Sequence, residues 1–125
     1  QQPKTIFHFK PFYLLITFYL MTIELPDEAK LILSTVCGDI SIEKLLSRDR
    51  TQPLPYKRKI AVYLIRRETG MNTTVLSRLF NFSTRNYVST IITEIHGLRN
   101  CIPEVNEDVT GYEKILKQHY QAAVK

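Results

Sequence analysis

Residues 73–98, TTVLSRLFNFSTRNYVSTIITEIHGL, decide the fold of this chain. Their pattern predicts a short helix over about residues 73–80, a tight turn over residues 81–83 and a longer helix over about residues 84–98. The apolar positions of the longer helix fall at helical spacing, as Val88, Ile91, Ile92, Ile95 and Leu98. Two helices joined by so short a turn, the second of them amphipathic, predict a helix-turn-helix unit.

The rest of the chain reads as helices separated by short loops. Upstream, the pattern predicts helices over about residues 26–38, 41–47 and 55–69. The third is the most apolar, and its predicted buried stripe comprises Ile60, Ala61, Leu64 and Ile65. Downstream, a helix is predicted over about residues 107–123, capped by Asn106. Because 125 residues suffice for one core, we expect an all-α fold, a helix-turn-helix bundle of five to six helices, with residues 21–125 as a single domain.

Residues 1–20 form an apolar, aromatic leader, in which residues 6–20 read IFHFKPFYLLITFYL. A membrane-spanning helix needs about 20 apolar residues, and Lys10 and Pro11 interrupt this run, so we expect no membrane span. The leader also lacks the small-residue cleavage site of a signal peptide. Two alternatives stay open: it precedes a native start at Met21, or it is an appended strand-like or helical segment. If ordered, it must bury its aromatic side chains, and one way is a homodimer through residues 1–20.

Positive charge is concentrated in one part of the chain. The net charge is +5 and the pI is about 9.3. Residues 48–67 hold seven basic residues against one acid, Asp49, so this window carries +6 and the remainder −1. The seven are Arg48, Arg50, Lys57, Arg58, Lys59, Arg66 and Arg67. Because a solvated surface usually mixes both signs, this concentration indicates a polyanionic partner.

The polar face of the predicted helix over residues 84–98 carries side chains that suit a DNA groove. Its first turns offer Thr84, Arg85, Asn86, Tyr87, Ser89, Thr90 and Thr93, with no acid before Glu94. Such groups hydrogen-bond to phosphates and to base edges in the major groove, where Arg pairs with guanine and Asn with adenine. An ordinary polar helix face has a similar composition, and the adjoining basic window is what favours DNA.

Residues 42–98 resemble the C-terminal DNA-binding domain of the bacterial replication initiator DnaA, a helix-turn-helix domain of Trp-repressor-like fold. The resemblance rests on LLSRDR (45–50), KRKIAVYLIRRETG (57–70) and TTVLSRLFNFSTRNYVSTIITEI (73–95), with Phe80 and Val88 on the family's fixed apolar positions. It implies that Arg50 takes the place of an arginine that enters the minor groove. It also implies that Arg58 and Lys59 take the place of a pair that grips phosphates.

The recognition residues depart from this family. Where DnaA proteins carry an Asp-His-Thr-Thr run, residues 84–87 are Thr-Arg-Asn-Tyr, so we expect DNA binding to persist on a target other than the DnaA box. The chain is also similar to the C-terminal tails of repeat-associated tyrosine transposases, through KIAVYLIRRETG and the YVS run at residues 87–89. Those enzymes need a His-x-His pair, which His8, His96 and His119 do not form.

The sequence contains no recognisable motif of an active site. It has no GxxxxGK[ST] run, no GxSxG run and no His, Cys and acidic cluster with metal spacing. We therefore expect no enzymatic activity, no metal, no cofactor and no small-molecule substrate. The two cysteines, Cys37 and Cys101, are too few for a disulfide scaffold and point to the inside of a cell. Together with the predicted DNA interface, this leads us to expect a cytoplasmic, nucleoid-associated protein.

These observations predict a bacterial or phage protein that binds double-stranded DNA in replication or transcription control. The residues expected at the interface are Arg48, Arg50, Lys57, Arg58, Lys59, Arg66, Thr73, Thr74, Thr84, Arg85, Asn86, Tyr87, Ser89 and Thr90. The basic residues would supply affinity. Residues 84–90, which we call the recognition turn, would supply sequence preference. Two other interpretations stay open: a protein-interaction adaptor on the same fold, and the DNA-binding tail of a transposase whose catalytic domain is absent.

Overall fold

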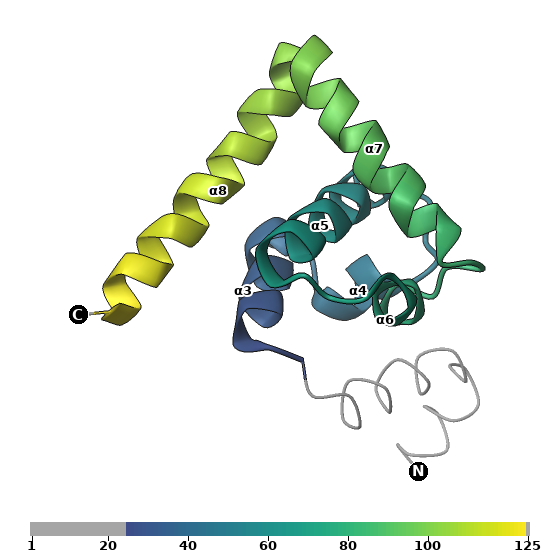
Figure 1. The fold of residues 1–125 in the computed structure, drawn as a ribbon, viewed down its shortest axis with the longest axis horizontal. Coiled ribbons are helices and arrows are strands. Elements are labelled where there is room, and N and C mark those ends of the chain that lie inside the picture. The colour runs from purple at the N-terminus through teal and green to yellow at the C-terminus, as the bar shows by residue number, and fades with distance from the viewer. Residues whose placement is uncertain (1–24, 125) are drawn as a thin grey trace.

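The computed structural model describes residues 25–124, which form six helices and no strand (Figure 1). The helices are α3 (Asp27–Cys37), α4 (Ile42–Leu46), α5 (Leu54–Thr69), α6 (Thr73–Leu79), α7 (Asn86–Cys101) and α8 (Pro103–Val124). The predicted all-α class is confirmed, since 77% of these residues are helical. The predicted leader, residues 1–20, and its homodimer lie outside the described residues. Within the described part, no helix is both long and apolar enough to cross a bilayer.

Helix α5 is the centre of the bundle and packs against α3, α4, α6 and α7 (Figure 1). The stripe predicted from the sequence is confirmed, because Ile60, Ala61, Leu64 and Ile65 are all fully buried. Full burial of one such aliphatic side chain contributes about 1.5–3 kcal/mol. The helix therefore anchors the elements around it, and it ends at Gly70, whose φ of 68° is the left-handed conformation that glycine adopts without strain.

Helix α7 buries one face and exposes the other. Val88, Ile91 and Ile95 are fully buried against the core, while Ile92 and Leu98 of the predicted stripe are only half-buried at its edges. This face packs on α5, α6 and α8. The opposite face, which carries the predicted DNA contacts, is left on the surface.

Helix α8 begins at Pro103, about one turn earlier than predicted. Proline suits a first helical position because its missing N–H needs no partner there. Asn106 is therefore not the cap but part of the helix, and its Oδ1 accepts a hydrogen bond from Arg99 Nε at 3.1 Å. The chain turns sharply at Ile102, so that α7 and α8 form a V (Figure 1).

Polar contacts fix α8 against the bundle. Tyr56 Oη donates to Asp108 Oδ2 at 2.7 Å, which joins α5 to α8. Glu113 of α8 pairs with Arg67 of α5 at 2.7 Å and with Arg99 of α7 at 2.8 Å. These contacts add to the burial of Val105, Val109 and Leu116, which form the apolar side of α8.

Candidate nucleic-acid interface

The start of α7 presents the predicted recognition residues to solvent. Thr84, Arg85, Asn86, Tyr87, Ser89 and Thr90 are all exposed. Between them Val88 points inward and is fully buried, which fixes the rotation of the helix about its axis. The first acid along this segment, Glu94, is paired with Lys59 at 3.0 Å. The first two turns of α7 thus offer amide, hydroxyl, phenol and guanidinium groups without an opposing carboxylate of their own.

Helix α7 begins at Asn86, two residues later than predicted, so the connection from α6 is longer than the expected three-residue turn. Arg85 precedes the helix in a right-handed conformation without a side-chain capping bond. Tyr87 N–H donates to Thr84 O at 3.3 Å and Val88 N–H to Arg85 O at 3.1 Å. These bonds span three residues, as in a 3₁₀ turn, so Thr84 and Arg85 form a tightened first turn that leads into the α-helix.

Aromatic stacking shapes the connection between α6 and α7. Asn81 adopts a φ of 58°, which reverses the chain, and asparagine tolerates this left-handed conformation better than most residues. Phe82 stacks on Phe80, with ring centroids 5.7 Å apart, and meets the Tyr87 ring edge-on at 4.9 Å. Because Phe80 is buried, this chain of contacts joins the core to Tyr87, whose side chain is 42% exposed. The position of the recognition turn is therefore set by packing.

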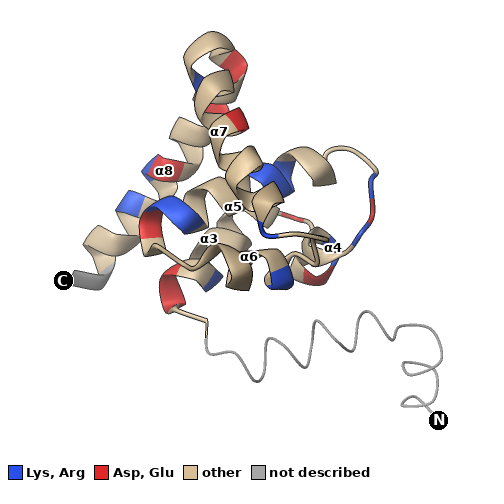
Figure 2. Ribbon diagram, turned by 45° about the vertical axis from the view of Figure 1, so that its right-hand side comes forward, with Lys and Arg blue, Asp and Glu red and all other residues tan. Residues whose placement is uncertain are grey.

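The basic loop between α4 and α5 is folded on itself. Asp49 Oδ1 accepts from Thr51 N–H at 2.8 Å, and Ser47 Oγ accepts from Asp49 N–H at 3.2 Å. The bond from Thr51 lowers the pKa of the Asp49 carboxyl, which stays charged between the two arginines. Arg48 and Arg50 are exposed on either side of it. Figure 2 shows this stretch as alternating blue and red beside α4.

Arg58 does not lie on the surface as a phosphate contact would. It is 8% exposed, its Nε donates to Leu45 O, and its NH2 donates to Asp49 O at 2.7 Å. Burial lowers the pKa of this guanidinium, and the nearby Asp49 and Tyr87 oppose that shift. Arg58 therefore attaches the basic loop to α5 from inside the protein, and Tyr87 lies near enough to affect its charge.

The other basic residues of the 48–67 window differ in the protein groups that their charged ends already contact. Lys59 is paired with Glu94, and Lys57 is half-buried with its Nζ 3.3 Å from Cys37 O. Arg66 lies eight residues along α5 from Arg58, which is about 12 Å at 1.5 Å per residue. Its NH1 donates to the carbonyls of Gly70 and Met71. Arg66 thus lies at the opposite end of α5 from the loop.

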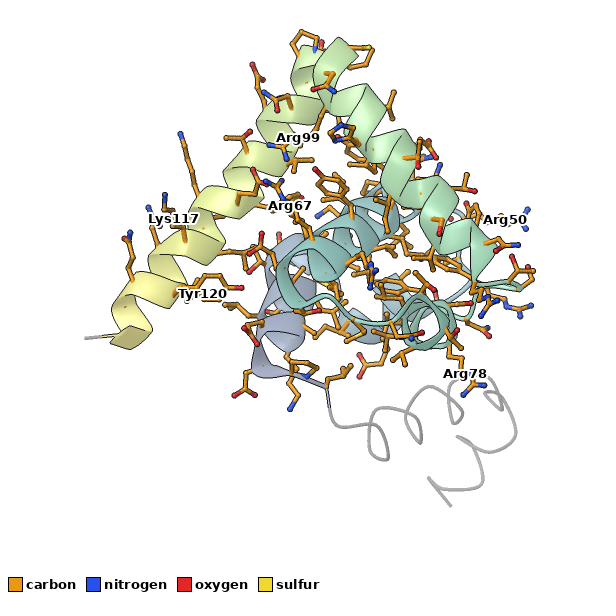
Figure 3. All side chains as sticks on the ribbon, in the orientation of Figure 1. Arg50, Arg67, Arg78, Arg99, Lys117 and Tyr120 are labelled. Atoms are coloured by element: carbon orange, nitrogen blue, oxygen red, sulfur yellow. The ribbon has the colours of Figure 1, made fainter. Side chains whose placement is uncertain are left out.

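Thr73 and Thr74 start α6 and are half-buried, with Asn72 Oδ1 accepting from Thr74 N–H at 2.7 Å. Arg78, which the sequence analysis did not single out, projects from the exposed side of α6. Figure 3 shows Arg50 and Arg78 on the side of the α6–α7 connection, and Arg67, Arg99 and Lys117 on the side of α8. The sequence signal for Arg78 was its position off the apolar stripe formed by Val75, Leu76 and Leu79 in the first helix of the pair.

Among residues 25–124, no group of three or more histidine, cysteine and acidic side chains is placed to hold a metal ion. Neither comparison of the sequence, with protein-family models or with curated proteins, gave a match. The described residues form an all-helical bundle in which α6 and α7 follow one another across the connection over residues 80–85. The recognition turn and the basic loop are its candidate interface.

Proposed function

We propose that the protein binds double-stranded DNA, with the first turns of α7 in the major groove and the α4–α5 loop on the adjoining backbone. The observation that carries the proposal is the exposed, acid-free turn from Thr84 to Thr90, backed by Val88 and held by the Phe80–Phe82–Tyr87 stack. A recognition helix reads bases with its N-terminal residues, so the side chains that meet DNA need to be exposed and rigidly placed.

Electrostatics supports the same assignment. The exposed cations on this side include Arg48, Arg50, Arg78 and Arg85. Arg58 and Lys59 already bond to protein groups, so we assign them to positioning the loop and α7. Three to four phosphate contacts give a slope of log K against log salt of about −3 to −4, at about −0.9 per contact.

The test is a fluorescence anisotropy titration of the full chain with a labelled random duplex over a series of salt concentrations. Arg50→Gln removes one cation from the proposed interface, and Lys117→Gln removes one from the α8 side (Figure 3). Both residues are exposed, so neither change disturbs the core. We expect Arg50→Gln to reduce the slope by about 1 and Lys117→Gln to leave it unchanged. Equal slopes for the two variants, or a slope near zero in the parent chain, would refute the proposal.

The finer assignments follow from the resemblance to the DnaA C-terminal domain. We propose a cytoplasmic, nucleoid-associated protein that acts in replication or transcription control and reads a sequence other than the DnaA box. Residues 84–87, Thr-Arg-Asn-Tyr, support a different target because they replace the run that reads that box. Selection of bound sites from a pool of random duplexes tests this point: enrichment of the DnaA box would contradict it.

The alternative of a protein-interaction adaptor has one observation in its favour. Tyr87 is exposed beside Phe82, and aromatic side chains are enriched at protein interfaces. An adaptor would show no binding to random duplex at low salt, and replacement of Arg50 would not matter to its partner. The salt titration therefore separates the two functions directly.

A further inference from the structure

A second basic region lies on the α8 side of the molecule, outside the proposed DNA interface. It is a cleft of about 750 Å³ between the C-terminal half of α5, the C-terminal half of α7 and the start of α8. Three arginines, Arg66, Arg67 and Arg99, line it, together with Asn100 and Asn106. This volume lies in the range of about 300–1,000 Å³ that is typical of small-molecule sites.

The charges in the cleft are not balanced. Glu113, which is the carboxylate bonded to these arginines, pairs with both Arg67 and Arg99, at 2.7 and 2.8 Å. Arg66 bonds only to the uncharged carbonyls of Gly70 and Met71, at 3.0 and 2.7 Å. Three guanidinium groups and one carboxylate leave an excess of two positive charges. Because like charges held together repel, a bound anion would stabilise this arrangement.

The donors in the cleft suit a phosphate group better than a carboxylate. Both bonds of Arg66 to carbonyls use the one nitrogen NH1, so its other N–H groups remain for a ligand. The side-chain amides of Asn100 and Asn106 add neutral donors from α7 and α8. A phosphate monoester carries about −1.5 to −2 charges and three acceptor oxygens, which match two excess cations surrounded by donors. Tyr63 and Ile92 add an apolar wall for the organic part of a ligand.

We propose that this cleft binds a small phosphate-bearing molecule, with the phosphate on Arg66 and the neighbouring guanidinium groups. The sequence pattern pointed to DNA and to no small-molecule substrate, so this class of ligand is suggested by the structure alone. The proposal does not depend on DNA binding, because Arg67 and Arg99 lie on the α8 side and Arg50 on the side of the α6–α7 connection (Figure 3). Either inference can therefore fail while the other stands.

The experiment titrates the full chain, without DNA, with inorganic phosphate and separately with adenosine monophosphate, at ionic strength held constant with sodium chloride. Backbone amide shifts are followed by NMR. The variant Asn100→Asp adds a negative charge to the cleft wall without a change of shape, and Asn100 is exposed, so the fold is retained. The matched control Gln52→Glu makes the same change of an exposed side-chain amide to a carboxylate in the α4–α5 loop, at the opposite end of α5 from Arg66.

We expect saturable binding below about 10 mM for at least one of the two probes, with the shifted amides in α5, α7 and the start of α8. Asn100→Asp should weaken this binding at least tenfold, because one unit charge about 6 Å from each unit charge of the anion has about a tenfold effect at an effective dielectric of about 40. Gln52→Glu should not weaken it. Arg66→Gln should weaken phosphate binding at least as much as Asn100→Asp. Tighter binding of the nucleotide than of inorganic phosphate would support contact of the nucleotide base with Tyr63.

Three outcomes would overturn the inference. The first is no saturable binding of either probe. The second is binding with shifts confined to the α4–α5 loop, which would show nonspecific attraction to the other basic surface. The third is equal affinity of Asn100→Asp and Gln52→Glu, which would show that the anion does not enter the cleft.

Discussion

Replacement of Arg58 distinguishes a residue that positions the basic loop from one that touches DNA. Its guanidinium donates to Leu45 O and Asp49 O and is 8% exposed. A hydrogen bond with a charged partner contributes about 1.5–3 kcal/mol. Because the bond to Asp49 O is only part-buried, so that water can partly replace the lost donor, we place the two bonds together at about 3 kcal/mol. Arg58→Ala should therefore lower the free energy of unfolding by about 3 kcal/mol.

The assay is urea unfolding followed by circular dichroism, together with thermal melting. At about 4–8 °C for each kcal/mol in a domain of this size, the melting temperature should fall by 12 °C or more. Arg58→Lys keeps the positive charge but not the planar fork that reaches two carbonyls, so we expect most of the loss to persist. Arg50→Ala is the control: Arg50 is exposed, and its removal should change stability by no more than about 0.5 kcal/mol.

DNA binding by the same variants completes the test. Arg58→Ala should weaken binding to every duplex alike, because the loop that carries Arg48 and Arg50 loses its attachment to α5. Unchanged stability in Arg58→Ala, combined with full binding in Arg58→Lys, would refute this reasoning. It would mean that Arg58 acts by its charge on a phosphate, as the family resemblance implies.

Three further predictions address specificity, the position of α8 and the cysteines. Asn86→Ala should cost about 1–3 kcal/mol on the preferred site and little on random duplex in anisotropy titrations; an equal loss on both would contradict a reading role. Tyr56→Phe removes the 2.7 Å bond to Asp108 and should lower stability by about 1 kcal/mol in urea unfolding without a change in DNA affinity; a large change in affinity would contradict the placement of α8 outside the interface. A thiol reagent at neutral pH should modify exposed Cys101 in the native protein and Cys37 only after unfolding, because burial raises the pKa of the Cys37 thiol; two rapidly reactive thiols in the native state would be inconsistent with the packing of α3.

Features that depend on neighbours in the sequence were predicted well. The apolar spacing of Ile60, Leu64 and Ile65 placed the buried face of α5, and Gly70 placed its end. The two helices of the recognition pair were also predicted, as was the exposure of the residues around Asn86. Boundaries were less accurate, because the tightened turn at Arg85 and the Pro103 start of α8 each depend on local hydrogen bonding that a periodic pattern does not show.

The amino-acid sequence by itself determined that this is an all-helical bundle, which residues face its core, and where the positive charge is concentrated. Only the tertiary structure decided which of those charges face solvent. Arg58 turns inward to carbonyls of another segment, and Lys59 meets Glu94, 35 residues further along the chain. Helical periodicity reports the burial of apolar faces, which is a local property. The partner of a long cationic side chain is set by which helices pack together, and that is known only once the chain is folded.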